Sequence, residues 1–134
     1  MPVPVEPSAM LLAKAVEDAN LAVKLKDDAT VSDEYIGFFC QQAVEKGIKS
    51  VLSRKRILFR WTHDLAQLVA LLEENGLTLP CELGDCVSLT PFAAVLRYDR
   101  LPEDQGEHEA FDRAGAVRMA SAAVAWADAL LGGD

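Results

Sequence analysis

Apolar and polar residues alternate with a helical period over much of this chain, most clearly in the stretch from Phe38 to Leu52. At about 100° per residue, the positions around this stretch separate into two faces. The apolar face comprises Ile36, Cys40, Ala43, Val44, Gly47, Ile48 and Val51. The opposite face carries Gln42, Glu45, Lys46 and Lys49. The pattern predicts an amphipathic helix with a wide apolar stripe, which suits a position inside a helical assembly.

The residues before this stretch predict a first helix. Prolines in residues 1–7 indicate a short, flexible N-terminal arm, and Ser8 is a suitable N-cap. Apolar residues at helical spacing then predict a helix from about Ala9 to Lys26. The central helix is expected from about Asp33 to Ser53, with acidic residues in its first turn, where the helix dipole favours them.

A third helix is predicted after a loop from Arg54 to Trp61. Thr62 is its expected N-cap, and Leu65, Leu68, Val69 and Leu72 form its apolar stripe. Asn75-Gly76 ends it, because these two residues best adopt a left-handed cap.

The remainder of the chain predicts two more helices and a polar loop. A short helical turn is expected near Leu83 to Val87, and Thr90-Pro91 restarts a short helix. An alanine-rich helix is expected from about Glu107 to Leu131. With no convincing strand, the prediction is a single all-α domain over residues 1–134. Its form is an up-and-down bundle of four main helices plus a short extra helix.

Tyr35 and Phe38 are unusual because they project toward the polar side of the central helix. Large aromatic side chains there indicate a second packing surface. Either another helix of the same chain or a second copy of the chain can occupy it.

The charge is unevenly distributed. The formal net charge of −8 argues against general nucleic-acid binding by the whole surface. Between Lys46 and Arg60, however, the chain has no acidic residue. The basic residues of this stretch are Lys46, Lys49, Arg54, Lys55, Arg56 and Arg60. They are either a solvated helix end and loop, or a contact surface for phosphate or an acidic partner.

The three cysteines do not form a framework for disulfides or a metal. Cys40 lies on the apolar face and is predicted to be a small core residue. Four residues separate Cys81 and Cys86, so their spacing does not match a zinc knuckle. We expect no metal and no cofactor.

The chain resembles the HEPN family (higher eukaryotes and prokaryotes nucleotide-binding domain). The matching elements are Phe38–Leu52 around Gln41-Gln42-Ala43-Val44-Glu45-Lys46, then Thr62-His63-Asp64-Leu65, and Arg97-Tyr98. They cover about Ala9 to Leu131. The resemblance implies an up-and-down helical bundle, often dimeric and commonly found beside small nucleotidyltransferases in toxin–antitoxin systems.

Many members of the family are metal-independent ribonucleases, with an arginine and a histidine four to six residues apart near the start of the last helix. This chain departs from that pattern. Seven residues separate Arg100 from His108, ten separate Arg97 from His108, and two separate Arg60 from His63. We therefore assign no catalytic residue.

The candidate binding residues are Gln42, Lys46, Lys49, Arg60, His63 and Arg97. The lysines can hold phosphate oxygens as point charges or pair with Glu45 or an acidic helix. His63 can donate to a phosphate or fix the loop through a buried hydrogen bond. Arg97 can bind a ligand or an internal carboxylate, for which Asp18, Asp64 and Asp99 are candidates.

Two functions follow as hypotheses. The first is a non-enzymatic module, as a homodimer, that binds a nucleotide or a partner protein such as a nucleotidyltransferase. The second is a ribonuclease toxin using Arg97 or Arg100 with His108, and RNA is a partner only in this case. The chain shows no targeting signal and no uncharged run of about 18 residues, so we expect a cytoplasmic protein without a membrane partner.

Overall fold

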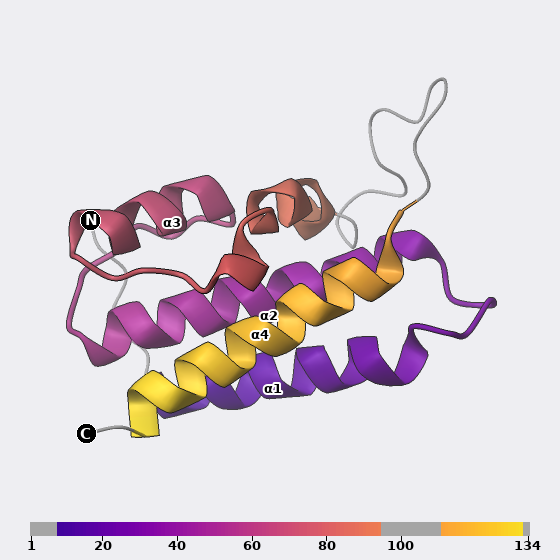
Figure 1. Ribbon diagram of the computed structural model, residues 1–134, viewed down its shortest axis with the longest axis horizontal. Helices are drawn as coiled ribbons and strands as arrows, with labels where there is room; N and C mark the ends of the chain where they lie inside the picture. Colours follow the sequence, from indigo (N-terminus) through magenta and orange to yellow (C-terminus); the bar gives the residue numbers. More distant parts are fainter. Residues whose placement is uncertain (1–7, 95–110, 133–134) are drawn as a thin grey trace.

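The computed structural model describes residues 8–94 and 111–132. These residues form four α-helices, two 3₁₀ segments and no β-strand (Figure 1). The α-helices are α1 (Ser8–Leu25), α2 (Asp33–Arg54), α3 (Leu65–Glu74) and α4 (Arg113–Gly132). The 3₁₀ segments are η1 (Cys81–Leu83) and η2 (Cys86–Ala94). The predicted all-α class is confirmed for this part of the chain.

Helix α2 is the centre of the fold. It packs against α1 and α4, which also contact each other, while α3 and η2 cover another side of it (Figure 1). The helix α1 runs antiparallel to α2. The helix α4 runs parallel to α2, because Arg113 at its start bonds Asp33 at the start of α2, and Ala123 approaches Gly47 further along. In an up-and-down bundle of four helices the second and the last helix run in the same direction, as α2 and α4 do, and the complete predicted arrangement stays a prediction.

The predicted apolar face of α2 is confirmed. All seven of its residues are buried: Ile36, Cys40, Ala43, Val44, Gly47, Ile48 and Val51. Burial raises the pKa of the Cys40 thiol to about 12, because the low-dielectric core disfavours the thiolate. Cys40 is therefore an inert core residue, as its position on the stripe predicts. In α1 the buried residues are Leu11, Ala15, Ala19 and Ala22, whereas Leu21 and Val23 are exposed.

Helix α2 contains two buried glycines, and only Gly37 is needed for close packing. A Cβ atom on Gly37 would lie 2.5 Å from Cδ1 of Phe92, which packs over this position from η2. A Cβ atom on Gly47 would lie 3.5 Å from the carbonyl oxygen of Ala123 in α4, which is ordinary contact. Gly37 is thus required by its neighbour, whereas Gly47 is not.

The N-cap of α3 is Asp64, not Thr62 as predicted. The Asp64 carboxylate accepts a hydrogen bond from the backbone N–H of Ala66, at 3.0 Å. Thr62 acts two residues earlier, where its hydroxyl oxygen accepts from the N–H of Asp64. An aspartate is as good a cap as a threonine, and here it stands two residues closer to the first helical turn. The predicted end is confirmed, with Asn75 as C-cap and Gly76 at φ 77°.

The chain after α3 differs from the prediction. No helix restarts at Thr90, because η2 already runs from Cys86 to Ala94 with Pro91 inside it. The last helix begins at Arg113, since Phe111 and Asp112 are not helical. The expected start near Glu107 and the polar loop before it lie outside the described residues.

Arg113 fixes the start of α4 against the turn between α1 and α2. Its guanidinium donates to the Asp33 carboxylate at 2.7 Å and to the backbone carbonyls of Lys26, Asp28 and Val31. Hydrogen bonds from Thr30, with a smaller effect of the Arg113 charge, lower the pKa of Asp28 in the same turn. One arginine thus joins the start of α4 to the start of α2 and to the turn that follows α1.

Of the described helices, α4 alone is long and apolar enough to cross a membrane, by length and composition only. Core helices of soluble proteins can pass the same test, and α4 packs on α2 and α1 through Ala116, Ala120, Ala123 and Ala127.

Candidate functional site

The candidate site forms where the chain between α2 and α3 folds back over the polar face of α2. Arg56 adopts φ 61° and turns the chain out of the helix. Along the segment that follows, Phe59, Trp61 and His63 contact polar residues of α2. Leu58, Arg60 and Thr62 line a cleft against α3, to which Phe59 also contributes. This alternation is typical of extended backbone, in which successive side chains point to opposite sides.

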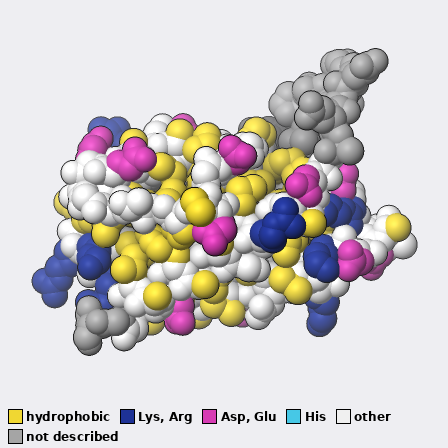
Figure 2. Space-filling model, in the orientation of Figure 1, with side chains coloured by type: hydrophobic (Ala, Val, Ile, Leu, Met, Phe, Trp, Pro, Cys, Tyr) yellow, Lys and Arg dark blue, Asp and Glu magenta, His cyan; other side chains and the backbone are white. Residues whose placement is uncertain are grey.

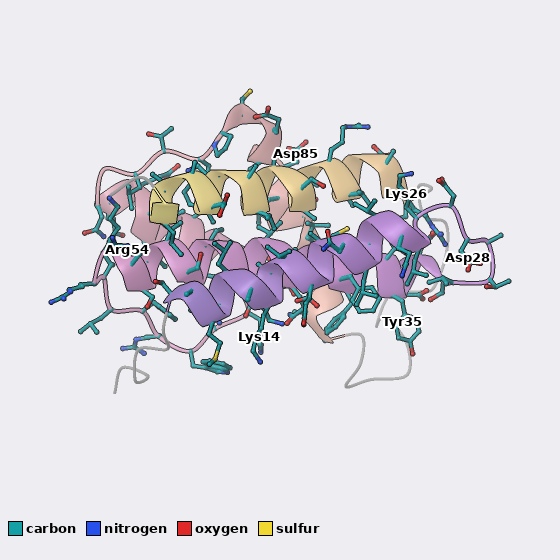
Figure 3. The ribbon with its side chains drawn as sticks, turned by 90° about the horizontal axis from the view of Figure 1, so that it is seen from below. Lys14, Lys26, Asp28, Tyr35, Arg54 and Asp85 are labelled. Atoms are coloured by element: carbon teal, nitrogen blue, oxygen red, sulfur yellow. The ribbon has the colours of Figure 1, made fainter. Side chains whose placement is uncertain are left out.

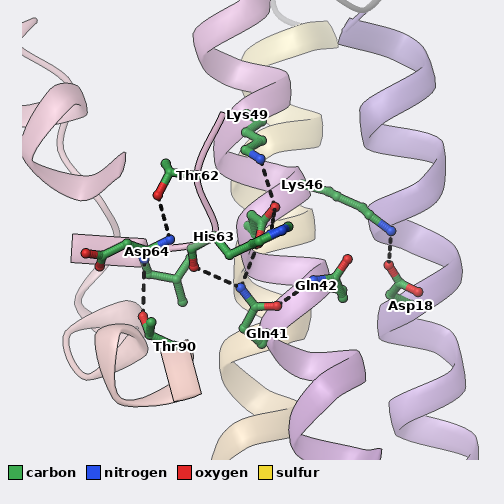
Figure 4. A network of polar contacts seen from close by, with 11 residues as sticks. Asp18, Gln41, Gln42, Lys46, Lys49, Thr62, His63, Asp64 and Thr90 are labelled. Atoms are coloured by element: carbon green, nitrogen blue, oxygen red, sulfur yellow. Dashed lines mark hydrogen bonds and ion pairs between the residues drawn. The ribbon is translucent and has the colours of Figure 1, made fainter. Parts of the chain in front are cut away.

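Beneath this segment lies a polar network of side chains from α2 and the loop (Figure 4), and Glu45 makes most of its bonds. Oε1 of Glu45 accepts a hydrogen bond from the Gln41 amide at 2.8 Å, and Oε2 lies 2.8 Å from Nζ of Lys49. Nδ1 of His63 lies 3.0 Å from Oε1 and 3.1 Å from Oε2. The Gln41 amide also bonds the backbone carbonyl of His63 at 3.3 Å. The network therefore links three successive turns of α2, at Gln41, Glu45 and Lys49, to His63 in the loop.

Lys49 and Glu45 are buried, contrary to their predicted place on a solvent-facing side of α2. Only 2% of Lys49 and 3% of Glu45 is exposed. Nζ of Lys49 lies 4.3 Å from the ring centroid of Trp61 and 5.9 Å from that of Phe59. A carboxylate and two aromatic rings thus surround the ammonium, which fits the rule that buried charges are paired. This lysine has no free donor surface for a phosphate.

The other predicted residues of α2 also have partners. Nζ of Lys46 lies 2.9 Å from the carboxylate of Asp18 on α1, and both side chains are partly exposed (Figure 4). The Gln42 amide donates to Oε1 of Gln41 at 2.6 Å. The predicted contact surface of Gln42, Lys46 and Lys49 is therefore largely an internal set of bonds that ties α2 to α1 and to the loop.

Arg60 is not among the residues that form the network. Arg60 is exposed and lines the cleft against α3, which has a volume of about 220 Å³. Its neighbours there include Leu58, Gln67, Leu71 and Glu74. Arg97 lies outside the described residues, as do Arg100 and His108 of the ribonuclease hypothesis.

Gln41 and Trp61 are site residues to which the sequence assigned no role, whereas Glu45 was the alternative partner expected for the lysines and Asp18 was considered only as a partner of Arg97. Gln41, Glu45 and Lys49 follow one another at intervals of four, which places them on one side of a helix. That spacing was the available signal for the network. Nothing local signals that Asp18, 28 positions before Lys46, or Trp61 lies beside these residues.

The basic stretch divides into two parts with different surroundings. Lys46 and Lys49, within α2, form ion pairs with carboxylates. The last residue of α2 and three residues of the loop after it are exposed: Arg54, Lys55, Arg56 and Arg60. Figure 3 shows Arg54 directed away from the bundle at the end of α2. In Figure 2, Lys and Arg side chains gather at the two ends of the face shown, including the left end where α2 stops.

The exposed part also carries large apolar side chains. Trp61 is 62% exposed and Leu58 is 60% exposed, more than any other large hydrophobic residue of the described chain. We call residues 55–61 the basic–aromatic segment. Exposed aromatic and aliphatic side chains next to cations are typical of a contact surface.

Other features of the described residues do not indicate chemistry. A larger cavity of about 740 Å³ lies between the 3₁₀ segments and α4, and none of the described candidate residues lines it. No group of three or more histidine, cysteine or acidic residues in the described chain is placed to hold a metal ion. The three cysteines are free.

These observations define an all-α domain with a central helix, a buried polar network and an exposed basic loop. The chain belongs to the HEPN family, because the family model for the HEPN domain matches residues 8–123. No curated protein and no solved structure matches the chain.

Proposed function

We propose that this protein is a non-enzymatic binding module that takes an anionic ligand on the basic–aromatic segment. The ligand is a nucleotide or an acidic surface of a partner protein. The observation that carries this proposal is that the basic residues between Lys46 and Arg60 differ in their surroundings. Those on α2 are paired, while Lys55, Arg56 and Arg60 are exposed on a protein of net charge −8.

Charge and apolar surface support the same location. Arg60 has no ion pair with any residue in the described ranges, so its guanidinium is available for a phosphate or carboxylate, which arginine binds in bidentate fashion. The acidic remainder of the molecule repels anions, so that a ligand is favoured at this segment over the rest of the surface.

We further propose that the module works as a homodimer and belongs to a toxin–antitoxin pair with a nucleotidyltransferase, in the cytoplasm. Family membership and the exposed aromatic ring of Tyr35 support these proposals. A nucleotidyltransferase gene beside the gene for this protein is the expected genomic context.

The test is calorimetric titration of the purified protein with nucleotides at low salt. We expect saturable binding that weakens in the double variant Lys55→Glu/Arg60→Glu by about tenfold or more, since two attractive charges become repulsive. The matched control is Lys14→Glu/Lys24→Glu, which reverses two exposed cations on α1 and changes the net charge equally. Binding in the control should stay within about twofold of wild type.

Equal weakening in the two double variants would show that only net charge matters and would contradict the location. Absence of binding to nucleotides and to a purified nucleotidyltransferase partner would contradict the proposed function itself.

A further inference from the structure

Trp61 presents one face of its indole to the protein and is otherwise open. The ammonium of Lys49 lies over the ring, 4.3 Å from its centroid. The ring of His63 meets Trp61 edge to face, with centroids 6.0 Å apart and an interplanar angle of 75°. Even so, 62% of the residue is exposed. The indole is thus supported from below and at one edge, while solvent covers the rest.

The support beneath the ring is rigid. Lys49 is bonded to Glu45, and Glu45 is bonded to Gln41 and His63, so the ammonium and the imidazole that contact Trp61 are both bonded to α2. Ordering an exposed tryptophan normally costs conformational entropy when a ligand binds. A ring that is already held in place avoids most of that cost, and a flat ligand can lie directly on it.

A fixed, exposed aromatic ring next to cations is the arrangement with which proteins hold unpaired nucleobases. Stacking on such a ring tolerates any base, because every base has a π face, and nearby cations hold the phosphate. Arg60, the residue before Trp61, is exposed and lines the cleft on the α3 side of the segment, so a phosphate bound by Arg60 would lie across the segment from the base on Trp61. An acidic peptide would use the cations but would gain little from a flat, solvent-facing indole.

We propose that Trp61 is a stacking platform for an unpaired nucleobase that carries a phosphate, with Lys49, Glu45 and His63 as the residues that position it. This inference rests on the proposed binding of an anionic ligand at the basic–aromatic segment. A free nucleotide and the base of a single-stranded RNA share the required chemistry.

Tryptophan fluorescence tests the platform directly, since the chain has two tryptophans. The variant Trp126→Phe removes the half-buried tryptophan of α4 and leaves Trp61 as the sole reporter. Its emission is titrated with AMP, with a hexa-adenylate RNA, and with ribose 5-phosphate, which has the phosphate but no base. We expect saturable quenching by AMP or the RNA and none by ribose 5-phosphate. The tighter of the first two identifies the source of the base.

Calorimetry on two further variants separates stacking from charge. Trp61→Leu should weaken binding of the better base-containing ligand by about 10- to 100-fold, as expected for loss of one stacked base. Trp61→Phe keeps an aromatic ring and should lose less than Trp61→Leu. Because Trp61 is exposed, both variants should keep the circular dichroism spectrum of the wild type.

The inference is overturned if AMP and the RNA leave the Trp61 emission unchanged, or if Trp61→Leu binds them like wild type. Ribose 5-phosphate that binds as tightly as AMP would also overturn it, while the anion-binding proposal would stand. Loss of binding to all three probes and to an acidic partner would remove both.

Discussion

At the scale of single residues, Glu45 is the centre of the site. Its carboxylate lies 2.8 to 3.1 Å from polar atoms of Gln41, Lys49 and His63. Glu45 itself has almost no exposed surface. A buried carboxylate is stable only when its charge and lone pairs are satisfied. The lysine that satisfies it is itself enclosed by Trp61 and Phe59, so removing either member of the pair exposes the other to an unfavourable environment.

Lys49→Met should therefore destabilise the protein far more than Lys46→Met. We expect a loss of about 3 kcal/mol for Lys49→Met, because the buried Glu45 carboxylate loses its closest cation. Lys46→Met breaks a partly exposed pair with Asp18 and should cost at most about 1 kcal/mol. Urea denaturation gives both values.

The double variant Glu45→Gln/Lys49→Met is the control. It removes both charges together, and it should recover a large part of the stability that Lys49→Met loses, since no unpaired charge stays buried. Equal losses for the two lysine variants would contradict the enclosed position of Lys49.

The residue scale also shows where prediction from sequence stops. The spacing of Glu45 and Lys49 identifies them as an i, i+4 pair, and the structure has that pair. A helical period, however, only divides α2 into an apolar and a polar side. The polar side is buried because residues 59–63 lie across α2. These residues have no helical pattern, so the sequence does not predict that they cover it. The same limitation hides Asp18 as the partner of Lys46.

At the scale of elements, close packing on α2 depends on one of its two glycines. The residues Gly37 and Gly47 are both helical and buried, but they face different neighbours. Gly37 faces the ring of Phe92 from η2, with no room for a methyl group, whereas Gly47 faces Ala123 of α4 with room for one.

The same substitution should consequently have opposite effects at the two positions. Gly37→Ala should destabilise by about 1–3 kcal/mol, because the new methyl group would overlap the Phe92 ring and force η2 to shift. Gly47→Ala should be neutral or stabilise by up to about 1 kcal/mol, because alanine lowers the entropy of the unfolded chain. Thermal unfolding of the two variants measures both.

Gly37→Ala combined with Phe92→Leu provides the check, since a smaller side chain at 92 makes space for the methyl group. Recovery of stability in this pair identifies the overlap as the cause. A Gly37→Ala protein as stable as wild type would mean that η2 does not lie tightly on α2.

Elements with their own caps were predicted well, and elements without them were not. The predicted bounds of α1, α2 and α3 agree with the structure to within a few residues, because Asn75 and Gly76 end α3 and polar residues begin α2. The prediction for the segment from Cys86 to Ala94 was wrong. Thr90-Pro91 has the sequence of a helix start, but the Thr90 hydroxyl accepts a hydrogen bond from the N–H of Leu65, and the proline sits inside η2. Thr90, which the local sequence pattern assigns to a helix cap, instead makes a tertiary contact with Leu65.

At the scale of the whole molecule, a net charge of −8 is combined with apolar side chains that stay exposed beside the described residues. Tyr35, at the start of α2, is 46% exposed (Figure 3). Phe38, one turn further along, is half-buried and contacts Phe39 edge to face. The predicted second packing surface is thus only partly filled from within the described chain, and this is the position that the proposed homodimer would use.

Tyr35→Asp should convert the proposed dimer to a monomer. A charge buried opposite a second copy of itself is unfavourable, both by desolvation and by repulsion between the two copies. Light scattering coupled to size exclusion should give twice the chain mass of 14.5 kDa for wild type and the chain mass for the variant. Leu21→Asp, an equal change of charge at an exposed apolar residue of α1, should stay dimeric.

A monomeric wild type would end the dimer proposal, and dissociation by Leu21→Asp alone would move the interface to α1. Because the basic–aromatic segment follows the opposite end of α2 from Tyr35, we expect the monomeric variant to keep its affinity for the ligand.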